Sequence, residues 1–372
     1  MKMKNCLKKK YLIIIKKKKL FKILVYLIIL SSIFINPKTY KNNHFQKKKI
    51  KIGIVGVRHG ENIGNNLIKY AMTLVFKKFG FIPYIIGTRK ENVNISFIKR
   101  KTNLVVIKKN FSEIKKNDYD ILMINSDQTW RKFDQHFYDY GFLNFAKNWD
   151  TKKFVYSASG IEYLNLTQKE IKKLKILLKN FTGISVREKG SVKLVKKYFN
   201  IIPEVTLDPT LLIDKKYYLD LIKDYEIIKN NNYIFIYTFN GNKKPLSLKR
   251  FINKASKILN YSIYEYPFNN NSSIENFIYK ISNSKAVITT TFHGTIFSII
   301  FNKPFITFTF NNKGKERFNS LGKLLSTENR FFNLKDNHDI NLLTTPLNIN
   351  YSLLKELRNK SIHFIKKSIG IL

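Results

Sequence analysis

The chain of 372 residues has a single cysteine, few acidic residues and few arginines. Cys6 alone cannot form an intramolecular disulfide or supply a cysteine-based zinc site, which excludes a disulfide-stapled module and a zinc finger. Only 25 Asp and Glu stand against 68 Lys and Arg, so the formal net charge is +43. Nine of the basic residues are arginines, and lysine carries the rest of the charge. This composition, without aromatic and basic interleaving or a helix-turn-helix signature, argues against nucleic-acid binding.

Apolar residues are plentiful in spite of this charge. They make up 44% of the chain, and 30 Phe and 21 Tyr bring the aromatic share to 14%. Such a chain buries enough apolar surface to offset the loss of conformational entropy, which excludes global disorder. Its length suggests two domains of roughly 150 residues each.

The first 49 residues form a basic and apolar tail. Residues 1–51 hold 16 Lys and no acidic residue, and the longer apolar run, Ile23–Ile35, has 13 residues. That run is shorter than the roughly 20 residues that span a bilayer, and no small-residue cleavage site follows it. Three interpretations stay open: a membrane-associating anchor, a signal peptide, and a leader or disordered segment without function.

From Ile50 on, apolar β-branched runs alternate with segments of helical periodicity, a pattern typical of parallel α/β domains. No internal repeat is visible. The predicted fold is α/β, with two doubly wound Rossmann-like domains over 50–207 and 208–372 after the tail over 1–49. Strands are expected at 50–56, 83–87, 104–107, 120–125, 154–159, 184–187, 204–207, 233–239, 262–266, 286–291 and 304–310. Helices are expected at 65–79, 167–180, 191–199, 246–259, 274–282, 295–301, 315–325 and 352–369.

Polar residues directly after the predicted strands are candidate site residues, because open parallel sheets bind ligands at the carboxyl ends of their strands. The loop 58–66, with Asn62, Gly64 and Asn65, precedes a helix whose free N–H groups favour an anion or a sugar hydroxyl. It matches neither a dinucleotide fingerprint nor a Walker loop, and an N-cap with a turn is the alternative. Asp127 and Gln128 follow the predicted strand 120–125, where they suit a hydroxyl-rich ligand or form an Asx turn.

Two further strand ends carry an arginine and a histidine. Arg187 could clamp a carboxylate or phosphate, or pair with the adjacent Glu188. His293, followed by Gly294 and a helix, is well placed as a general acid but could equally be structural. The other histidines are scattered without metal-ligand spacing, so no metal site is predicted.

Six segments in this order resemble the polysaccharide pyruvyl transferase family over residues 50–332. Each segment is weak alone, but their order and spacing together are specific. Two positions depart from the commonest pattern, because Asn125 stands where a Gly is frequent and Thr291 where a Ser is frequent. The segments are NIGNN (62–66), INSDQTW (124–130), YSASG (156–160), SVREKGS (185–191), EVTLDPTLLI (204–213) and TTFHGTIFSIIFNKPFI (290–306).

The resemblance implies a GT-B-like fold and an enzyme of the cell envelope that moves a pyruvyl group from phosphoenolpyruvate to a sugar hydroxyl. The acceptor would belong to a cell-surface polysaccharide or its lipid-linked precursor, and the products would be a ketal sugar and phosphate. No cofactor beyond this donor is expected. The implied roles are catalysis for His293 and Asp127, donor binding for Arg187, Gly294, Thr295 and Arg317, and acceptor or loop contacts for Asn62, Gly64, Asn65, Gln128 and Glu188.

Two other function classes compete with this interpretation. The same architecture serves glycosyltransferases that use a sugar nucleotide, since a fold does not fix a function. A non-enzymatic basic protein that binds the membrane surface through its tail is the other class. Phosphoenolpyruvate is a cytosolic metabolite, so the expected location is cytoplasmic, either free or held at the inner face of the membrane by the tail.

Overall fold

The computed structural model describes residues 49–56, 62–86, 105–107, 110–225, 231–239, 244–267, 273–309, 314–336 and 338–372. The predicted tail lies outside the described residues except for its last position, and so do residues 58–61 of the first candidate loop. Lys49–Leu372 form one compact unit, separate from Met1–Lys48.

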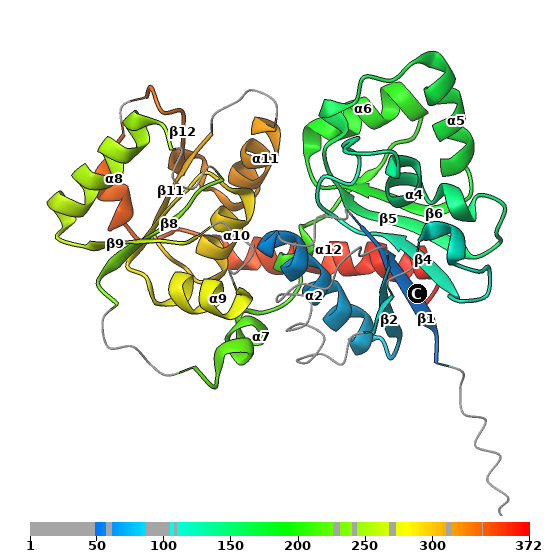
Figure 1. Cartoon of the computed structure of the whole chain (residues 1–372), viewed down its shortest axis with the longest axis horizontal. Coiled ribbons are helices and arrows are strands. Elements are labelled where there is room, and N and C mark those ends of the chain that lie inside the picture. The colour runs from blue at the N-terminus through cyan, green and yellow to red at the C-terminus, as the bar shows by residue number, and fades with distance from the viewer. Residues whose placement is uncertain are drawn as a thin grey trace, which may run out of the picture. The chain divides into compact units, whose positions relative to one another are not determined.

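This unit contains two parallel β-sheets (Figure 1). Within the described residues, the first sheet has seven strands in the order β3-β2-β1-β4-β5-β6-β7, and the second has five in the order β12-β11-β10-β8-β9. The first sheet consists of β1 (Lys51–Val55), β2 (Ile82–Ile86), β3 (Val105–Ile107), β4 (Ile121–Ile124), β5 (Lys152–Ala158), β6 (Phe181–Val186) and β7 (Glu204–Val205). The second consists of β8 (Tyr233–Tyr237), β9 (Ser262–Glu265), β10 (Ala286–Thr289), β11 (Phe305–Phe308) and β12 (Phe331–Phe332).

Helices cover both faces of each sheet, as parallel sheets require. They are α2 (Ile63–Lys78), α4 (Phe137–Phe142), α5 (Gln168–Leu178), α6 (Lys189–Phe199), α7 (Lys215–Leu219), α8 (Leu246–Leu259), α9 (Ile274–Asn283), α10 (Phe292–Ile300), α11 (Lys315–Leu325) and α12 (Tyr351–Ile369). Short 3₁₀ turns, such as Ile161–Tyr163 and Pro209–Leu211, complete the connections.

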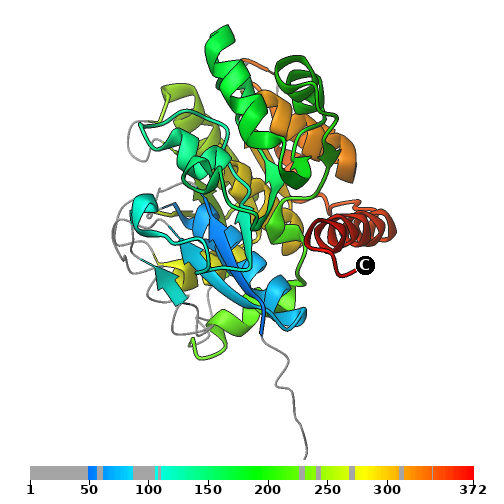
Figure 2. The same cartoon turned by 90° about the vertical axis from the view of Figure 1, so that its right-hand side faces the viewer.

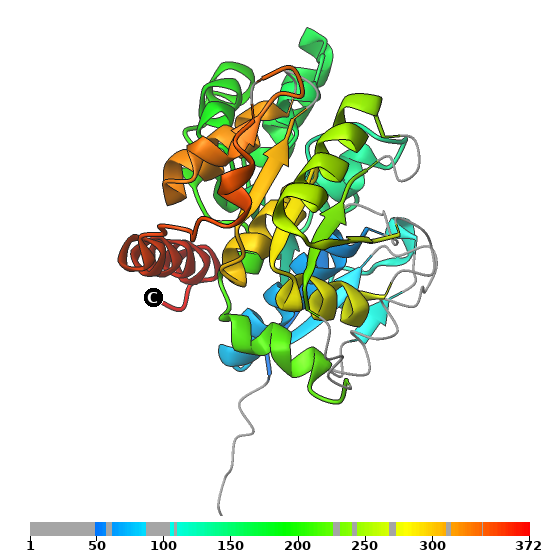
Figure 3. The ribbon, with the colours of Figure 1, turned by 90° about the vertical axis from the view of Figure 1, so that its left-hand side faces the viewer.

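Alternation along the strands divides the core into layers. In the first sheet, Ile54 and Met123 share a core with α2 and α12, whereas the next residues along the strands, Val55 and Ile124, share one with α4, α5 and α6. In the second sheet, α8 covers the face of Ile234, and α9 and α10 cover the opposite face (Figure 3). Most strand residues are therefore buried between helices, and the polar groups of the candidate site lie at the ends of the strands.

The last helix returns to the first sheet. Thr182 Oγ1 on β6 donates to the Ser368 carbonyl at 2.6 Å, and the Leu207 N–H donates to Ser361 Oγ at 3.0 Å. Phe364 packs beneath β5, with its ring centroid 6.2 Å from that of Tyr156. Figure 2 looks along this helix. Residues at the C-terminal end of the chain thus stabilise the sheet formed by its N-terminal half.

The predicted α/β fold class is confirmed, because both sheets are parallel and each predicted strand and helix is present with small changes at its ends. The domain bounds 50–207 and 208–372 stay a prediction. One change matters for the site. Helix α10 begins at Phe292 instead of 295, since Thr291 accepts the Gly294 N–H and caps the helix there. Among the described residues, no helix is long and apolar enough to cross a bilayer.

Replacing Phe364 by alanine tests the docking of α12. Because this ring is 3% exposed, the free energy of unfolding should fall by about 3–5 kcal/mol. Chemical denaturation measures it. His363→Ala, an exposed neighbour on the same helix, should change the stability by less than about 0.5 kcal/mol, and equal effects of the two substitutions would contradict the docking.

Candidate functional site

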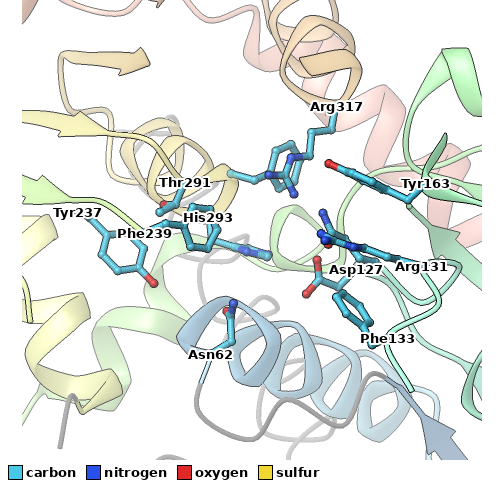
Figure 4. A pocket seen from close by; sticks show the side chains of 12 residues that line it. Asn62, Asp127, Arg131, Phe133, Tyr163, Tyr237, Phe239, Thr291, His293 and Arg317 are labelled. Atoms are coloured by element: carbon cyan, nitrogen blue, oxygen red, sulfur yellow. The ribbon is translucent and has the colours of Figure 1, made fainter. Parts of the chain in front are cut away.

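A cavity of about 340 Å³ lies at the carboxyl ends of strands from both sheets (Figure 4). This is where parallel sheets place ligands. The side chains around it come from the start of α2, the loop after β4, the end of β8 and the starts of α10 and α11. The lining residues are Asn62, Asp127, Gln128, Arg131, Phe133, Tyr163, Tyr237, Phe239, Thr291, Phe292, His293 and Arg317.

The loop after β4 holds Asp127 in an unusual conformation. Its φ is +80°, in the left-handed region that costs a non-glycine residue on the order of 1 kcal/mol. The loop is fixed because the Ser159 N–H donates to the Asp127 carbonyl at 3.0 Å and the Trp130 N–H donates to the Ser159 carbonyl at 3.1 Å. This backbone turns the Asp127 carboxylate into the cavity (Figure 4).

Trp130 contributes to the core and not to the ligand surface. Its side chain is fully buried, and the indole N–H donates to the Gly141 carbonyl at 3.0 Å. The polar residues before Trp130 also differ in their surroundings, since Ser126 is buried in the core and Gln128 lines the cavity. The sequence pattern alone did not separate these two roles.

The start of α2 lies beside the cavity, next to the loop after β4. Asn62 caps the helix by accepting the Asn65 N–H at 3.1 Å, and Asn65 Nδ2 lies 3.4 Å from Asp127 Oδ2. Gly64 faces the imidazole of His293 so closely that a Cβ atom at this position would lie 2.0 Å from Nδ1. Any side chain at position 64 would therefore displace His293.

His293 lies in the first turn of α10, with 9% of its side chain exposed. Its Nε2 is buried and, within the described part of the chain, has no hydrogen-bond partner. The nearest charged group is Asp208 Oδ2 at 3.7 Å. Gly294 and Thr295 lie behind His293, outside the cavity lining, and their hydrogen bonds to Thr291 hold α10 in place.

Arg187 is the centre of a buried charge network. Its Nη1 lies 2.9 Å from Asp208 Oδ2 and its Nε lies 3.1 Å from Glu188 Oε1. Asp127 Oδ1 is 3.9 Å from Nη1, and the guanidinium carbon lies 4.2 Å from the ring centroid of Phe292. Burial opposes the charge, but the three carboxylates outweigh it and raise the pKa of the Arg187 guanidinium above its ordinary value.

Two guanidinium groups beside the cavity have buried nitrogens that, within the described part of the chain, have no hydrogen-bond partner. These nitrogens are Arg187 Nη2 and Arg317 Nε, which donate no hydrogen bond to any described residue. Arg317 also stacks on Phe292, at 5.7 Å from its ring centroid. Burial and the charge of Arg187 lower the pKa of the Arg317 guanidinium. Two neighbouring cations with unused donors form a favourable environment for an anion.

A third arginine, Arg131, faces the cavity from the loop after β4. Its guanidinium carbon lies 4.4 Å from the ring centroid of Tyr163, and its Nη1 donates to Gln128 Oε1 at 3.0 Å. The sequence analysis did not single out this residue, although the scarcity of arginine in the chain could have indicated it. The described residues contain no group of three or more His, Cys, Asp or Glu side chains placed to hold a metal ion.

The cavity brings together five of the eleven predicted site residues. Asn62, Asp127, Gln128, His293 and Arg317 line it. The remaining predicted residues, Gly64, Asn65, Arg187, Glu188, Gly294 and Thr295, lie outside its lining, so their assigned contacts with substrates stay predictions. Residues that the sequence analysis did not assign to the site are Arg131, Phe133, Tyr163, Tyr237, Phe239, Thr291 and Phe292 in the lining and Asp208 behind it.

Gly64→Ala tests the contact between α2 and His293. Since the new methyl group overlaps the imidazole, the free energy of unfolding should fall by about 1–3 kcal/mol, measured by urea denaturation. Gly56→Ala is the matched control, because among the described residues a Cβ there meets Asn125 Cβ at 3.6 Å and no other atom within 4 Å. Equal stability of Gly64→Ala and wild type would refute this packing.

Lys69 provides a test of the site's electrostatics. It lies one turn after Asn65 on α2, and burial lowers the pKa of its ammonium to about 8, an effect that Asp127 partly opposes. The folded state therefore disfavours the charged form, so stability should fall as the pH decreases from about 10.5 to 8 and stay low below that range. Lys69→Met removes this penalty and should raise the free energy of unfolding at pH 7 by about 2–3 kcal/mol.

The measurement is the unfolding free energy between pH 7 and 10.5. Exposed Lys172→Met on α5 is the control and should leave the pH dependence as it is in the wild type. A Lys69→Met protein that is less stable at pH 7 and keeps the wild-type pH dependence would contradict the prediction.

Comparisons with known proteins bear on the fold and the family. No curated protein sequence matches the chain. The S. aureus MnaA–UDP co-structure is 12% identical with a TM-score of 0.50, and the alignment covers 87% of this chain and 98% of that one. UDP-GlcNAc 2-epimerase from Neisseria meningitidis bound to UDP-GlcNAc is 12% identical with a TM-score of 0.51, and the alignment covers 86% of this chain and 96% of that one. At these identities the likeness concerns the fold alone, and it confirms the predicted GT-B-like α/β fold.

The sequence itself identifies the family. The model of the polysaccharide pyruvyl transferase family matches residues 62–312, more than half of the chain. The matched range contains each lining residue of the cavity except Arg317. The chain therefore belongs to the polysaccharide pyruvyl transferase family, a family of transferases.

Proposed function

We propose that this protein transfers the pyruvyl group of phosphoenolpyruvate to hydroxyl groups of a polysaccharide or its precursor, forming a pyruvylated sugar and phosphate. The observation that carries the proposal is the pair of buried guanidinium nitrogens on Arg187 and Arg317 that have no hydrogen-bond partner among the described residues, in a member of this family whose cavity His293 also lines. Phosphoenolpyruvate has a carboxylate and a phosphate, so it supplies an anionic group for each arginine.

The positive ends of two helices support the same assignment. His293 lies in the first turn of α10, and the first turn of α2 faces its ring through Gly64. Helix N-termini favour anions. Together with the arginines, these helix ends offset the negative charge of the donor. Separate lysines on an exposed surface would offset it less, because water weakens their attraction to the donor.

His293 and Asp127 then have complementary roles. His293 donates a proton to C3 of the enol, and C2 becomes an oxocarbenium-like electrophile. An acceptor hydroxyl attacks C2 and gives its proton to Asp127, which the left-handed backbone turns into the cavity. The bond between C2 and the phosphate oxygen breaks, a second hydroxyl attacks C2, and its proton leaves with the phosphate. The donor loses phosphate, the sugar gains a cyclic ketal, and no oxidation state changes.

The remaining lining suits a sugar acceptor. Tyr163, Tyr237 and Phe239 offer aromatic faces for a sugar ring, and Asn62 and Gln128 offer amide groups for its hydroxyls. A cavity of about 340 Å³ holds phosphoenolpyruvate and part of one sugar ring, so the rest of the glycan would extend outside it. We place this reaction in the cytoplasm, where the donor is made.

The activity test measures acceptor-dependent phosphate release from phosphoenolpyruvate by the full chain, with a panel of free and lipid-linked glycans. His293→Gln should lower kcat/KM at least about 100-fold because it removes the acid. Arg317→Met should raise the KM for phosphoenolpyruvate about 10- to 100-fold through loss of a charged hydrogen bond.

Exposed residues supply matched controls for both substitutions. His363→Gln on α12 and Arg250→Met on α8 should leave the kinetics as in the wild type. Unchanged release in His293→Gln would refute the site assignment. Thermal protection by UDP or GDP sugars, with no release from phosphoenolpyruvate, would overturn the proposal in favour of glycosyl transfer.

A further inference from the structure

We infer that Arg131 binds an anionic group of the sugar acceptor, so that the acceptor is a sugar with a carboxylate or a phosphate. This inference rests on the proposed function, because it names the class of acceptor for the same cavity. Arg131 lines the cavity from the loop after β4, and the proposed reaction leaves it without a role. Three of the nine arginines of the chain, Arg131, Arg187 and Arg317, lie at or beside this cavity.

The backbone of Arg131 is fixed by contacts on both sides of the peptide. Its N–H donates to the Gln128 carbonyl at 3.0 Å, and its own carbonyl accepts the Tyr140 hydroxyl at 3.0 Å. Gly160, at a φ of +93°, packs so closely that a Cβ there would lie 3.1 Å from Arg131 Cβ. The side chain therefore starts from a constant position at the edge of the cavity.

Two aromatic rings hold the Arg131 guanidinium. Its carbon lies 4.9 Å from the ring centroid of Phe133 and 4.4 Å from that of Tyr163, and Figure 4 shows it between the two rings. Aromatic rings attract the flat face of a guanidinium, whereas its N–H groups point outward in the plane of the group. The edge of the guanidinium thus stays open to a ligand, and this edge matches the two oxygens of a carboxylate or a phosphate.

The described part of the chain does not balance the charge of Arg131. Nη1 donates to the neutral amide of Gln128 at 3.0 Å, and among the described residues the guanidinium has no other hydrogen bond and no ion pair. Arg187, by contrast, has three carboxylates within 3.9 Å. A cation that meets only rings and an amide attracts an anionic ligand strongly, because a cavity screens charges less than bulk water does.

The neighbours of Arg131 are residues that the proposed reaction gives to the acceptor. Gln128 and Tyr163, which contact its guanidinium, are the groups proposed for the hydroxyls and the ring of the sugar. Asp127, the proposed base for the acceptor hydroxyl, belongs to the same loop and lines the same cavity. Under that proposal, the two anionic groups of the donor already have a guanidinium each. An anion at Arg131 therefore belongs to the acceptor.

Binding of three sugars to the full chain tests the inference. Glucose is the neutral probe, glucuronate carries a carboxylate and glucose 1-phosphate carries a phosphate, and saturation-transfer NMR titrations give the dissociation constants. At least one acidic sugar should bind the wild type about 10-fold more tightly than glucose, and the tighter of the two identifies the anionic group. Arg131→Met should abolish this preference and change the affinity for glucose less than about 2-fold.

Two other arginine substitutions control the titrations. Arg250→Met, at an exposed position on α8, should keep the preference of the wild type. Arg317→Met should keep it as well, because the proposed function gives this guanidinium to the donor. Equal affinities of the wild type for the three sugars, or a preference that Arg317→Met removes and Arg131→Met keeps, would overturn the inference.

Kinetics separate the inference from the proposed function. With the acidic acceptors of the glycan panel, Arg131→Met should raise the KM for the acceptor about 10-fold and leave the KM for phosphoenolpyruvate within about 3-fold of wild type. A rise confined to the KM for phosphoenolpyruvate would place Arg131 at the donor and contradict the inference. A wild type that releases no phosphate would refute the proposed function instead, and the sugar titrations would still decide whether Arg131 binds an anion.

Discussion

The site depends on the buried carboxylate of Asp208, which holds a guanidinium and an imidazole from different parts of the chain. Arg187 follows β6 of the first sheet and His293 begins α10 of the second, and both approach the same oxygen of Asp208. Burying these charges is costly unless each has a partner. Loss of Asp208 would remove one of the three carboxylates around the buried Arg187 guanidinium, so the ion pairs connect the stability of the unit to the geometry of its site.

The fold supplies this convergence through simple constraints. Parallel strands end at one edge of a sheet, and the helices that follow begin there with free N–H groups. Gly64 lets the first turn of α2 approach His293, and the left-handed backbone at Asp127 turns a carboxylate toward the same space. Strain at Asp127 and close approach at Gly64 both occur beside the cavity, where the surrounding hydrogen bonds hold them in place.

Much of the fold could be predicted from the sequence, because long apolar runs and helical periodicity are local signals. Short elements carry no such local signal, because tertiary packing decides their conformation. Examples are α4 with six residues, α7 with five and β12 with two. Among site residues, His293 and Asp127 could be predicted because they follow strands and match a family segment. Arg131, Tyr163 and Tyr237 could not, since a residue that is directed into a cavity has the same sequence signal as one that is buried or exposed.

Side-chain positions add two facts that the sequence pattern does not contain. Trp130 follows a polar segment and fills the core beneath it. Arg187, whose role at the donor stays a prediction, contacts three carboxylates, and within the described part of the chain its Nη2 has no hydrogen-bond partner. Both outcomes depend on contacts between segments far apart in the chain, which periodicity cannot reveal.

The most direct measurement is a crystal structure of the full chain with phosphoenolpyruvate bound. The account predicts that the two anionic groups of the donor lie within hydrogen-bond distance of Arg187 Nη2 and Arg317 Nε, one at each arginine, with C3 of the donor next to the imidazole of His293. Phosphoenolpyruvate bound outside this cavity, or bound with its C3 atom away from His293, would contradict the central claim.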